Sequence, residues 1–374
     1  MALELWTYQD TVEHLLDVFD LDRTNRNLRL ARSSILNTYR DMPNRCRWAY
    51  YDRQYILKTA ASQTTGTIEF DYTGGSSELL VTLTGATWPT WAEYGRLIIA
   101  GVHYEIDKRL SSTTLTLKTD SNPGADVAAL TTYTIYRNSY PLPNDFRRLN
   151  QVWDRTSVRE LPIALPDSVN QELQWIYSTP GIPVCGTIRN TGEFQSSLSV
   201  QFSPPPQTAR SYDISYQAKG RDLVTEKYST GTVSMSAAGT TVTGSSTVFA
   251  TKHVGCVIRF SADGTTEPSS RIGNRTSNVD NPATFETIIK SFTSATSVTT
   301  VDAAPAALSA VKYTISDPLD IEPNAMFTAF QKLAEAEFAR QIKREDSDKW
   351  LADAMRGLRL AMESDDRADG TQGG

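Results

Sequence analysis

The sequence lacks paired cysteines and long hydrophobic runs. Its 374 residues include three cysteines, Cys46, Cys185 and Cys256, without any C-x-x-C pair, so neither a disulfide framework nor a zinc site is indicated. No apolar run approaches the ~18 to 20 residues that span a bilayer. The N-terminal MALELWTYQD has no basic segment and no apolar segment, so we expect no signal peptide, no membrane association and an intracellular product.

The sequence also lacks the common catalytic and metal-binding motifs. It contains no H-E-x-x-H, G-x-S-x-G or Walker-type loop and no D-x-D-x-D-G calcium loop. Its three histidines, His14, His103 and His253, lie far apart in the chain. We therefore expect no enzyme, no cofactor and no metal, although a two-carboxylate glycosidase stays open because its acids need no fixed spacing.

The charge is weakly acidic overall but basic near the N-terminus. A net charge of -6 and a pI near 5.3 argue against a protein that coats nucleic acid, which needs a basic face. Residues 21–50 nevertheless contain seven arginines and two aspartates. Arg26, Arg29 and Arg32 recur at a spacing of three, which predicts that they share one flank of a helix.

Helical periodicity is confined to the two ends of the chain. Apolar residues recur at helical spacing in residues 8–20 and 25–39, which predicts an antiparallel helical hairpin. Pro43 is expected to end the second helix, because proline disfavours helix in the residue before it. Helical patterns return after Pro323, in residues 324–343 and again around Trp350 and Leu358.

The sequence between these ends is typical of β structure. From Trp48 to about Tyr313 it is rich in Thr, Ser, Val, Gly and Tyr, in short alternating runs between turn residues. Residues 198–220 are expected to form a hairpin of two strands across a proline-rich turn.

An internal repeat occupies much of this β region. TGTIEF at Thr65 matches TGTVSM at Thr230, and four further matches follow in the same order, including Gly95 with Gly255 and Tyr133 with Tyr313. Each copy has about five short strands with turn glycines, which predicts a small barrel.

These patterns predict an α+β fold: a terminal helical hairpin and bundle, a β core and two inserted small β-barrel-like modules. The expected parts are residues 1–58 (hairpin and first strand), 59–138 (module 1), 139–226 (central β region), 227–317 (module 2), 318–362 (C-terminal helices) and 363–374 (flexible tail).

The ordered series of motifs resembles the head-to-tail adaptor (connector) proteins of tailed bacteriophages. In that family a helical hairpin leads through a Pro-Asn turn into an aromatic strand, here DMPNRCRWAYYDRQYIL (41–57), and a Y-x-L-P-x-D-F segment follows, here residues 140–146. A G-x-P turn, a strand ending in P-x-P, a tyrosine-rich return strand and an alanine-rich C-terminal helix complete the series, here residues 181–183, 202–206, 212–216 and 324–343. The second module departs from the smaller members of the family.

The resemblance implies a structural virion protein at the portal vertex, assembled in the host cytoplasm. Such adaptors form a ring, usually of twelve copies, that binds the portal protein above and tail proteins below and extends the DNA channel. An acidic chain suits a channel that passes DNA without holding it. The C-terminal segment of the family reaches the portal, which makes Trp350, Leu358, Met362, Asp365 and Asp366 candidates for portal docking.

Alternatives stay open for each candidate. Arg26, Arg29 and Arg32 are subunit-interface candidates, but they can also meet DNA, solvent or the acidic residues of their own hairpin, namely Asp10, Glu13, Asp17 and Asp20. Trp350 and Leu358 can instead pack within the chain's own helices. An alternative function is a tail-associated glycan- or receptor-binding protein, in which Trp88, Trp91, Tyr94 and Tyr104 of module 1 stack on sugars; module 2 has Val248 near the position of Trp88.

Overall fold

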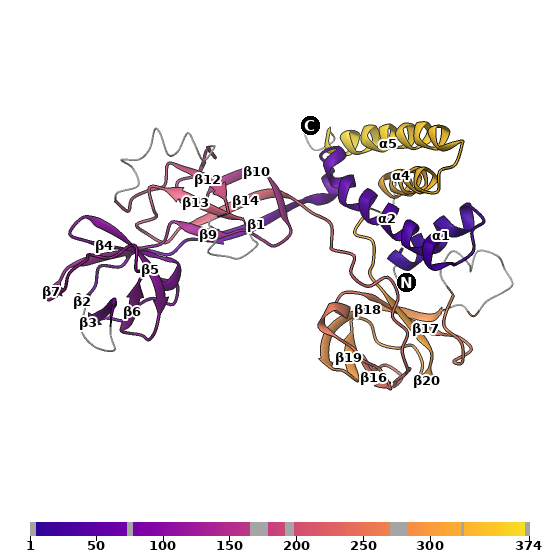
Figure 1. Cartoon of the computed structure of the whole chain (residues 1–374), viewed down its shortest axis with the longest axis horizontal. Coiled ribbons are helices and arrows are strands. Elements are labelled where there is room, and N and C mark those ends of the chain that lie inside the picture. The colour runs from indigo at the N-terminus through magenta and orange to yellow at the C-terminus, as the bar shows by residue number, and fades with distance from the viewer. Residues whose placement is uncertain are drawn as a thin grey trace. The chain divides into compact units, whose positions relative to one another are not determined.

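The protein combines helices with strongly curled sheets in two compact units. The computed structural model describes residues 5–72, 78–164, 179–190, 198–269, 281, 283–322 and 325–370, with side chains up to residue 365. The first unit comprises Met1–Tyr51 and Gly220–Gly374, and the second comprises Asp52–Lys219. The chain therefore leaves the first unit once and returns to it once (Figure 1).

The helices of the described residues all belong to the first unit. They are α1 (Tyr8–Val18), α2 (Asn25–Arg45), α4 (Ala325–Gln341) and α5 (Ser347–Gly370). Short 3-10 turns lie at η1 (Ala49–Tyr51), η2 (Ala92–Tyr94) and η4 (Thr251–His253). A capping box starts α1: the backbone N–H of Asp10 donates to the Thr7 hydroxyl at 3.3 Å, and the N–H of Thr7 donates to the Asp10 carboxylate at 3.0 Å.

One apolar core holds these helices together. Aromatic side chains cross it between elements far apart in sequence: the rings of Phe19 and Phe338 lie 5.3 Å apart and those of Tyr39 and Phe330 lie 6.2 Å apart. Pairs at these distances add to the stabilisation that burial alone provides. The predicted helices are present. Because the helices from both ends of the chain share this core, they form one helical bundle.

Two boundaries of the helices differ from expectation. Pro43 does not end α2, which continues to Arg45. The proline cannot donate the helical hydrogen bond to the carbonyl four residues earlier, but only two residues of the helix follow it, and the Met42 carbonyl accepts a bond from the Trp48 indole at 2.9 Å. The predicted flexible tail is helical over most of its length, because α5 continues to Gly370. Its residues 363–370 are mainly good helix formers and charged residues.

The central β region of the second unit contains two antiparallel sheets. One has the order β1 (Asp52–Lys58), β14 (Ser211–Ala218), β10 (Phe146–Asp154) and β11 (Arg159–Glu160). The other has the order β12 (Cys185–Arg189), β13 (Ser199–Ser203) and β9 (Ser139–Pro141). Their side chains share one core, in which the rings of Phe202 and Tyr212 stack with centroids 4.6 Å apart.

The hairpin expected at residues 198–220 is therefore wrong. Its two strands, β13 and β14, belong to different sheets and face each other through their side chains. A hairpin within one sheet and two strands in facing sheets predict the same alternation of apolar residues, because in both cases each strand buries one face in the shared core.

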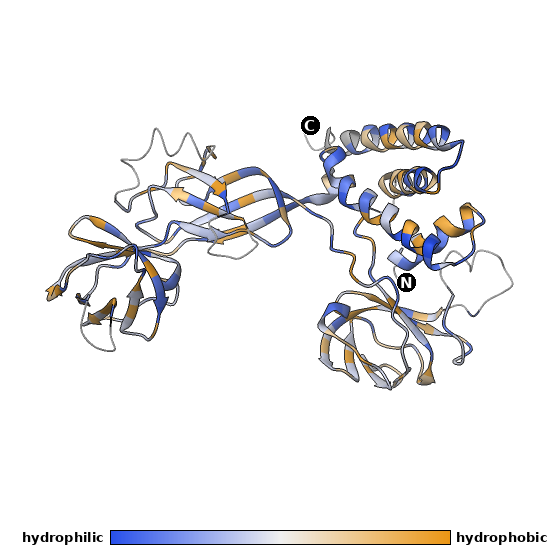
Figure 2. Ribbon diagram, in the orientation of Figure 1, coloured by the Kyte–Doolittle hydropathy of each residue, from blue (hydrophilic) through white to orange (hydrophobic). Residues whose placement is uncertain are grey.

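The two modules have the same strand order. The sheet of module 1 runs β7 (Val127–Thr131), β2 (Thr67–Asp71), β3 (Leu80–Thr84), β6 (Thr114–Leu117), β5 (Val102–Arg109), β4 (Arg96–Ile99) and β8 (Tyr133–Tyr136). The sheet of module 2 runs β20 (Leu308–Val311), β15 (Thr232–Met235), β16 (Thr241–Ser245), β19 (Ser297–Thr300), β18 (Ala283–Ser294), β17 (Val257–Ser261) and β21 (Tyr313–Ser316). Hydrophobic residues recur along the strands of both (Figure 2).

Each sheet curls until it is nearly closed. In module 1, Gln63, just before β2, exchanges two backbone hydrogen bonds of 2.9 Å with Ile135 of β8. In module 2, Tyr228, just before β15, makes the same exchange with Ile315 of β21. The segment that starts each module thus joins the last strand to the first.

The repeated Thr-Gly-Thr has a physical cause. Gly66 and Gly231 both have positive φ, +90° and +85°, which favours glycine. A Cβ at Gly66 would lie 2.6 Å from the Thr84 carbonyl of β3, and one at Gly231 would meet the Ser245 carbonyl of β16. The threonine before each glycine accepts a bond from a strand-end tyrosine: Tyr133 to Thr65 at 2.8 Å and Tyr313 to Thr230 at 2.6 Å.

The sheet register corrects the sequence match in one place. The sequence pairs Gly95 with Gly255, and so Leu97 with Val257. In the structure Leu97 lies opposite Ile135 and Ile258 lies opposite Ile315, so Leu97 corresponds to Ile258. The one-residue shift places Arg259 of module 2 at the position of Ile98 in module 1.

Candidate functional site

The predicted arginine flank lies on the exposed side of α2, but its members differ. Arg26, Arg29 and Arg32 are all exposed. Arg32 forms an ion pair with Glu226. Within the described part of the chain, Arg26 and Arg29 form no ion pair and no side-chain hydrogen bond. Two of the three candidates therefore hold a charge that no described residue compensates.

The hairpin's own acidic residues account for little of the arginine charge. Glu13 pairs with Arg23, and burial raises the pKa of Glu13, with the nearby Arg23 acting in the opposite direction. Asp10 is fully buried and has another partner. Asp17 and Asp20 lie exposed at the end of α1. The hairpin thus supplies a partner for Arg23 rather than for the predicted flank.

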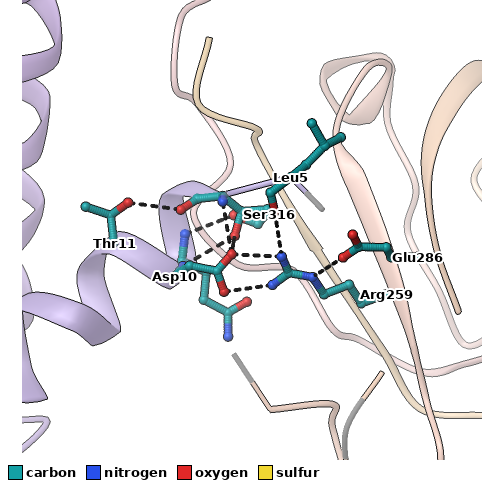
Figure 3. A network of polar contacts seen from close by, with 8 residues as sticks. Leu5, Asp10, Thr11, Arg259, Glu286 and Ser316 are labelled. Atoms are coloured by element: carbon teal, nitrogen blue, oxygen red, sulfur yellow. Dashed lines mark hydrogen bonds and ion pairs between the residues drawn. The ribbon is translucent and has the colours of Figure 1, made fainter. Parts of the chain in front are cut away.

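The partner of Asp10 is Arg259, 249 residues away in module 2 (Figure 3). The guanidinium donates two bonds of 2.8 Å to the carboxylate, one of 3.0 Å to Glu286 and one of 3.0 Å to the Leu5 carbonyl. Arg259 is only 4% exposed. This bidentate pair attaches module 2 to the N-terminal helix, and the four bonds that the guanidinium donates give it a structural role.

Sequence reasoning missed this network. Asp10 is expected from its position to suit the exposed amides of a first helical turn, and it does cap α1 through Thr7. The available signal was Arg259 itself, a lone charge in the otherwise apolar or small run VIRFS, all of which is buried. A buried arginine requires a carboxylate partner, but the sequence gives no indication of which one.

The portal-docking candidates lie on α5 and largely face their own bundle. Leu358 is buried, and Met362 packs against the helical core. The ring of Trp350 lies 5.0 Å from that of Phe19, and its indole donates to Asp346 at 3.2 Å. Asp365 accepts a bond of 3.0 Å from the Ala49 N–H, whereas the side chain of Asp366 lies outside those described. These positions favour packing within the chain for Trp350 and Leu358.

Other apolar residues of α5 remain exposed. Leu351 is 50% exposed, Met355 is 45% exposed and Leu360 is 58% exposed. Leu351 and Met355 are four residues apart and so lie on one side of the helix, whereas Leu360 lies on the opposite side. The sequence did not single out this exposed pair, because its spacing is the same as that of core residues.

A groove of about 420 Å³ runs beside the exposed pair, between α2, α4 and α5. Leu333 and Ala336 of α4 and Leu351 of α5 provide its apolar surface. Ion pairs lie at its rim, between Arg45 and Asp41 at 2.6 Å and between Arg340 and Glu337 at 2.7 Å. Such a groove suits an apolar segment of a protein partner better than a small polar substrate.

The histidines and cysteines have structural surroundings. His14 bonds Glu335 of α4 at 2.7 Å, and His103 bonds the Tyr136 hydroxyl at 2.8 Å. Burial raises the pKa of the Cys185 thiol and raises that of Cys256 to about 12, so neither is a ready nucleophile at neutral pH. No group of three potential metal ligands occurs among the residues that the structure describes.

The proposed sugar platform is largely inside module 1. Trp88 is 2% exposed, and Trp91 and Tyr104 pack against the same core. Tyr94 is exposed, with the Arg137 guanidinium 5.4 Å from its ring centre. The counterpart of Trp88 in module 2 is Phe249 rather than a site near Val248, because Trp88 and Phe249 make equivalent backbone bonds, to Ser112 and Ala295. Both aromatics fill the interior of their modules.

The described helices include none long and apolar enough to cross a membrane. The chain matches no protein-family model and no curated protein. The likeness to phage adaptors therefore rests on the motifs of the sequence alone.

Proposed function

We propose that the chain is a non-enzymatic head-to-tail adaptor of a tailed bacteriophage. Copies form a ring, of twelve if it follows the family it resembles, below the portal protein of the virion. The ring extends the DNA channel without sequence-specific binding and carries the tail proteins. Assembly takes place in the host cytoplasm.

The observation that carries the proposal is the incomplete packing of α5. Among its described residues this 24-residue helix fully buries Ala354, Leu358 and Ala361. It exposes Leu351, which lines the groove between α2, α4 and α5, and Met355, one turn further along the helix. Exposed apolar side chains beside a groove are typical of a surface that binds a protein. In an adaptor, this is the surface we assign to the portal.

The two modules support a role in holding other proteins. We propose that both are small barrels inserted into one scaffold. Their interiors are filled by apolar side chains such as Leu97 and Leu115 in module 1 and Ile258 and Val298 in module 2. A packed interior gives rigidity and favours spacer or contact modules. The burial of Trp88 gives the glycan-binding alternative no specific support.

A binding experiment with the portal protein tests the proposal. The full chain is mixed with the portal encoded in the same genome, and particles are examined by negative-stain electron microscopy. The double variant Leu351→Glu with Met355→Glu is expected to lose portal binding, because two charges would enter the apolar contact. Leu360→Glu, on the opposite side of α5, is the matched control and is expected to bind.

Two results contradict the proposal. One is a stable monomer that never joins the portal, even at high concentration. The other is equal loss of binding in the control, because this would show that any charge on α5 disrupts the helix. Circular dichroism of both variants checks that the fold is retained.

A further inference from the structure

The α1–α2 hairpin carries two sets of uncompensated charges. The aspartate tip consists of Asp17, Asp20 and Asp22, where α1 ends and the link to α2 begins. The arginine face consists of Arg26, Arg29 and Arg40 on α2. All six side chains are exposed. Within the described residues, none of the six charged groups makes an ion pair or a side-chain hydrogen bond.

Two of these charges, Asp17 and Arg26, are also on the unfavourable ends of their helices. Asp17 lies in the last turn of α1, where carbonyl groups carry partial negative charge, and no basic residue accompanies it. Arg26 lies in the first turn of α2, where amides carry partial positive charge, and that turn has no acidic residue. A favourable choice would be the reverse at both places. Charges that oppose the helix dipole are expected at sites that have a function besides stabilising the fold.

The neighbouring charges of the unit are, in contrast, paired. Arg23 binds Glu13, Arg32 binds Glu226, and Arg259 binds Asp10. Exposure alone does not decide which charges are paired, since the Arg23 and Arg32 side chains are also largely exposed. The six charges of the aspartate tip and the arginine face have no such partner among the described residues, which leaves them available to another molecule.

The arginine face is continuous and points away from the bundle. Arg29 and Arg40 are separated by 11 residues, which is about three helical turns, so they lie on the same side of α2. The core residues of α2, such as Ile35 and Met42, lie on the opposite side. A partner can therefore contact this face without displacing any core side chain.

We propose that the aspartate tip of one copy docks on the arginine face of a second copy of the chain. The tip and the face are different surfaces of opposite charge, so the contact is heterologous, and repetition of such a contact closes a ring when the rotation allows. Val18, which is 40% exposed between the aspartates, adds an apolar contact at the tip. The inference deepens the proposed function by naming the surfaces that join neighbouring subunits.

Charge reversal provides the test, with two variants of the full chain. Variant A is Arg26→Glu with Arg29→Glu, and variant B is Asp17→Lys with Asp22→Lys. Each alone places like charges in the contact and is expected to weaken self-association at least roughly tenfold. An equimolar mixture is expected to assemble again, because the altered face of A matches the altered tip of B and the two native surfaces match each other.

A second measurement separates association from folding. Arg26→Glu in variant A and Asp17→Lys in variant B place charges in the orientation that the helix dipole favours, and all four substituted side chains are exposed, so the monomers are expected to melt close to the wild-type temperature. Lys349→Glu with Arg359→Glu is the control variant, since it changes the charge equally at exposed positions of α5. Self-association is measured by sedimentation velocity at low and high salt, alone and with the portal.

The outcomes decide between the inference and the proposed function. Loss of assembly in A and in B, its return in the mixture and weakening by salt support the contact. Assembly of A or B that equals the wild type overturns the contact and leaves the adaptor function standing. A wild-type chain that never self-associates, alone or on the portal, overturns both.

Discussion

The two modules share a fold, but the outward side of β17 in module 2 and the outward side of its counterpart β4 in module 1 carry different residues with different contacts. In module 2 the outer side of β17 carries Arg259, which is buried in its contact with Asp10 of α1. In module 1 the equivalent position on β4 is Ile98, which is half-buried and lies opposite His103. Both curled sheets bury a mainly aliphatic and aromatic core, whereas the outward position occupied by Arg259 in module 2 holds Ile98 in module 1.

This comparison distinguishes the features that form the module fold from the contacts that attach module 2 to α1. The strand order, the positive-φ glycines and the strand-end tyrosines are shared. Attachment to α1 combines the buried Arg259–Asp10 pair with a bond of 3.1 Å from the Gln9 N–H to the Ser316 hydroxyl of β21 and one of 2.8 Å from the Tyr8 N–H to the Asp317 carbonyl. A duplicated module can thus keep its interior and acquire a new place in the molecule through a few outward positions.

The largest expected effect comes from removing Arg259. Arg259→Ala leaves Asp10 fully buried without its cation, which costs about 3–5 kcal/mol when a buried pair loses one partner. The matched change in module 1, Ile98→Ala, is expected to cost less than about 1.5 kcal/mol, because that side chain is only half-buried. Hydrogen–deuterium exchange of peptides from each module and from α1 measures both.

A double variant sharpens this test. Arg259→Met with Asp10→Asn replaces the ion pair with uncharged groups, and the introduced carboxamide still offers an oxygen to the Thr7 N–H. We expect the double variant to be more stable than Arg259→Ala, because it removes the buried charge of Asp10, whereas both variants equally deprive Glu286 of Arg259. Equal stability of Arg259→Ala and Ile98→Ala would contradict the view that the two faces differ in importance.

Much of the fold was predictable because it is encoded locally. The helices follow from apolar residues at helical spacing, as at Leu15 and Leu16 in α1 or Ile35 in α2. The repeat was visible because glycine at positive φ and the paired tyrosine both require specific residue types. The exposed arginines at 26 and 29 followed from the same helical periodicity.

What failed depends on contacts between distant residues. The pairing of Asp10 with Arg259 leaves no pattern in the local sequence. The separation of β13 from β14 leaves none either, since each strand shows the same alternation of apolar residues whichever strand it pairs with. The register of β17 was misplaced by one residue because glycine was matched with glycine. The exposed pair Leu351 and Met355 could not be distinguished from core residues, because only the packed bundle determines which face α5 buries.

The next largest effect tests what the modules share. Gly66→Ala and Gly231→Ala each put a Cβ against a strand carbonyl at positive φ, and each is expected to cost roughly 2 kcal/mol in its own module. Gly124→Ala is the control: its φ is +73°, but no atom lies within 4 Å of the added Cβ, so only the backbone cost of about 1 kcal/mol applies. Local exchange protection reports each cost. A loss in one module alone would show that the matched glycines differ in role.

The smallest expected effect is a loss of stability at acidic pH, which is expected in module 2 and not at the equivalent position of module 1. His253 in module 2 is buried, and its backbone bonds make it the counterpart of Ala92 in module 1. Burial, together with the nearby Lys252, lowers the pKa of His253, so the folded state favours the neutral ring. The unfolded chain takes up the proton first as the pH falls below about 6.5.

Stability from His253 is therefore complete above that pH and is lost as the pH falls toward the lowered folded-state pKa. Module 2 should lose exchange protection between pH 7 and pH 5, after correction for intrinsic exchange rates. His253→Gln keeps most of the volume without a titrating ring and should remove that pH dependence, while Ala92 gives module 1 no such step. Acid loss that persists in His253→Gln would assign it to other groups and would leave the modules alike in this respect.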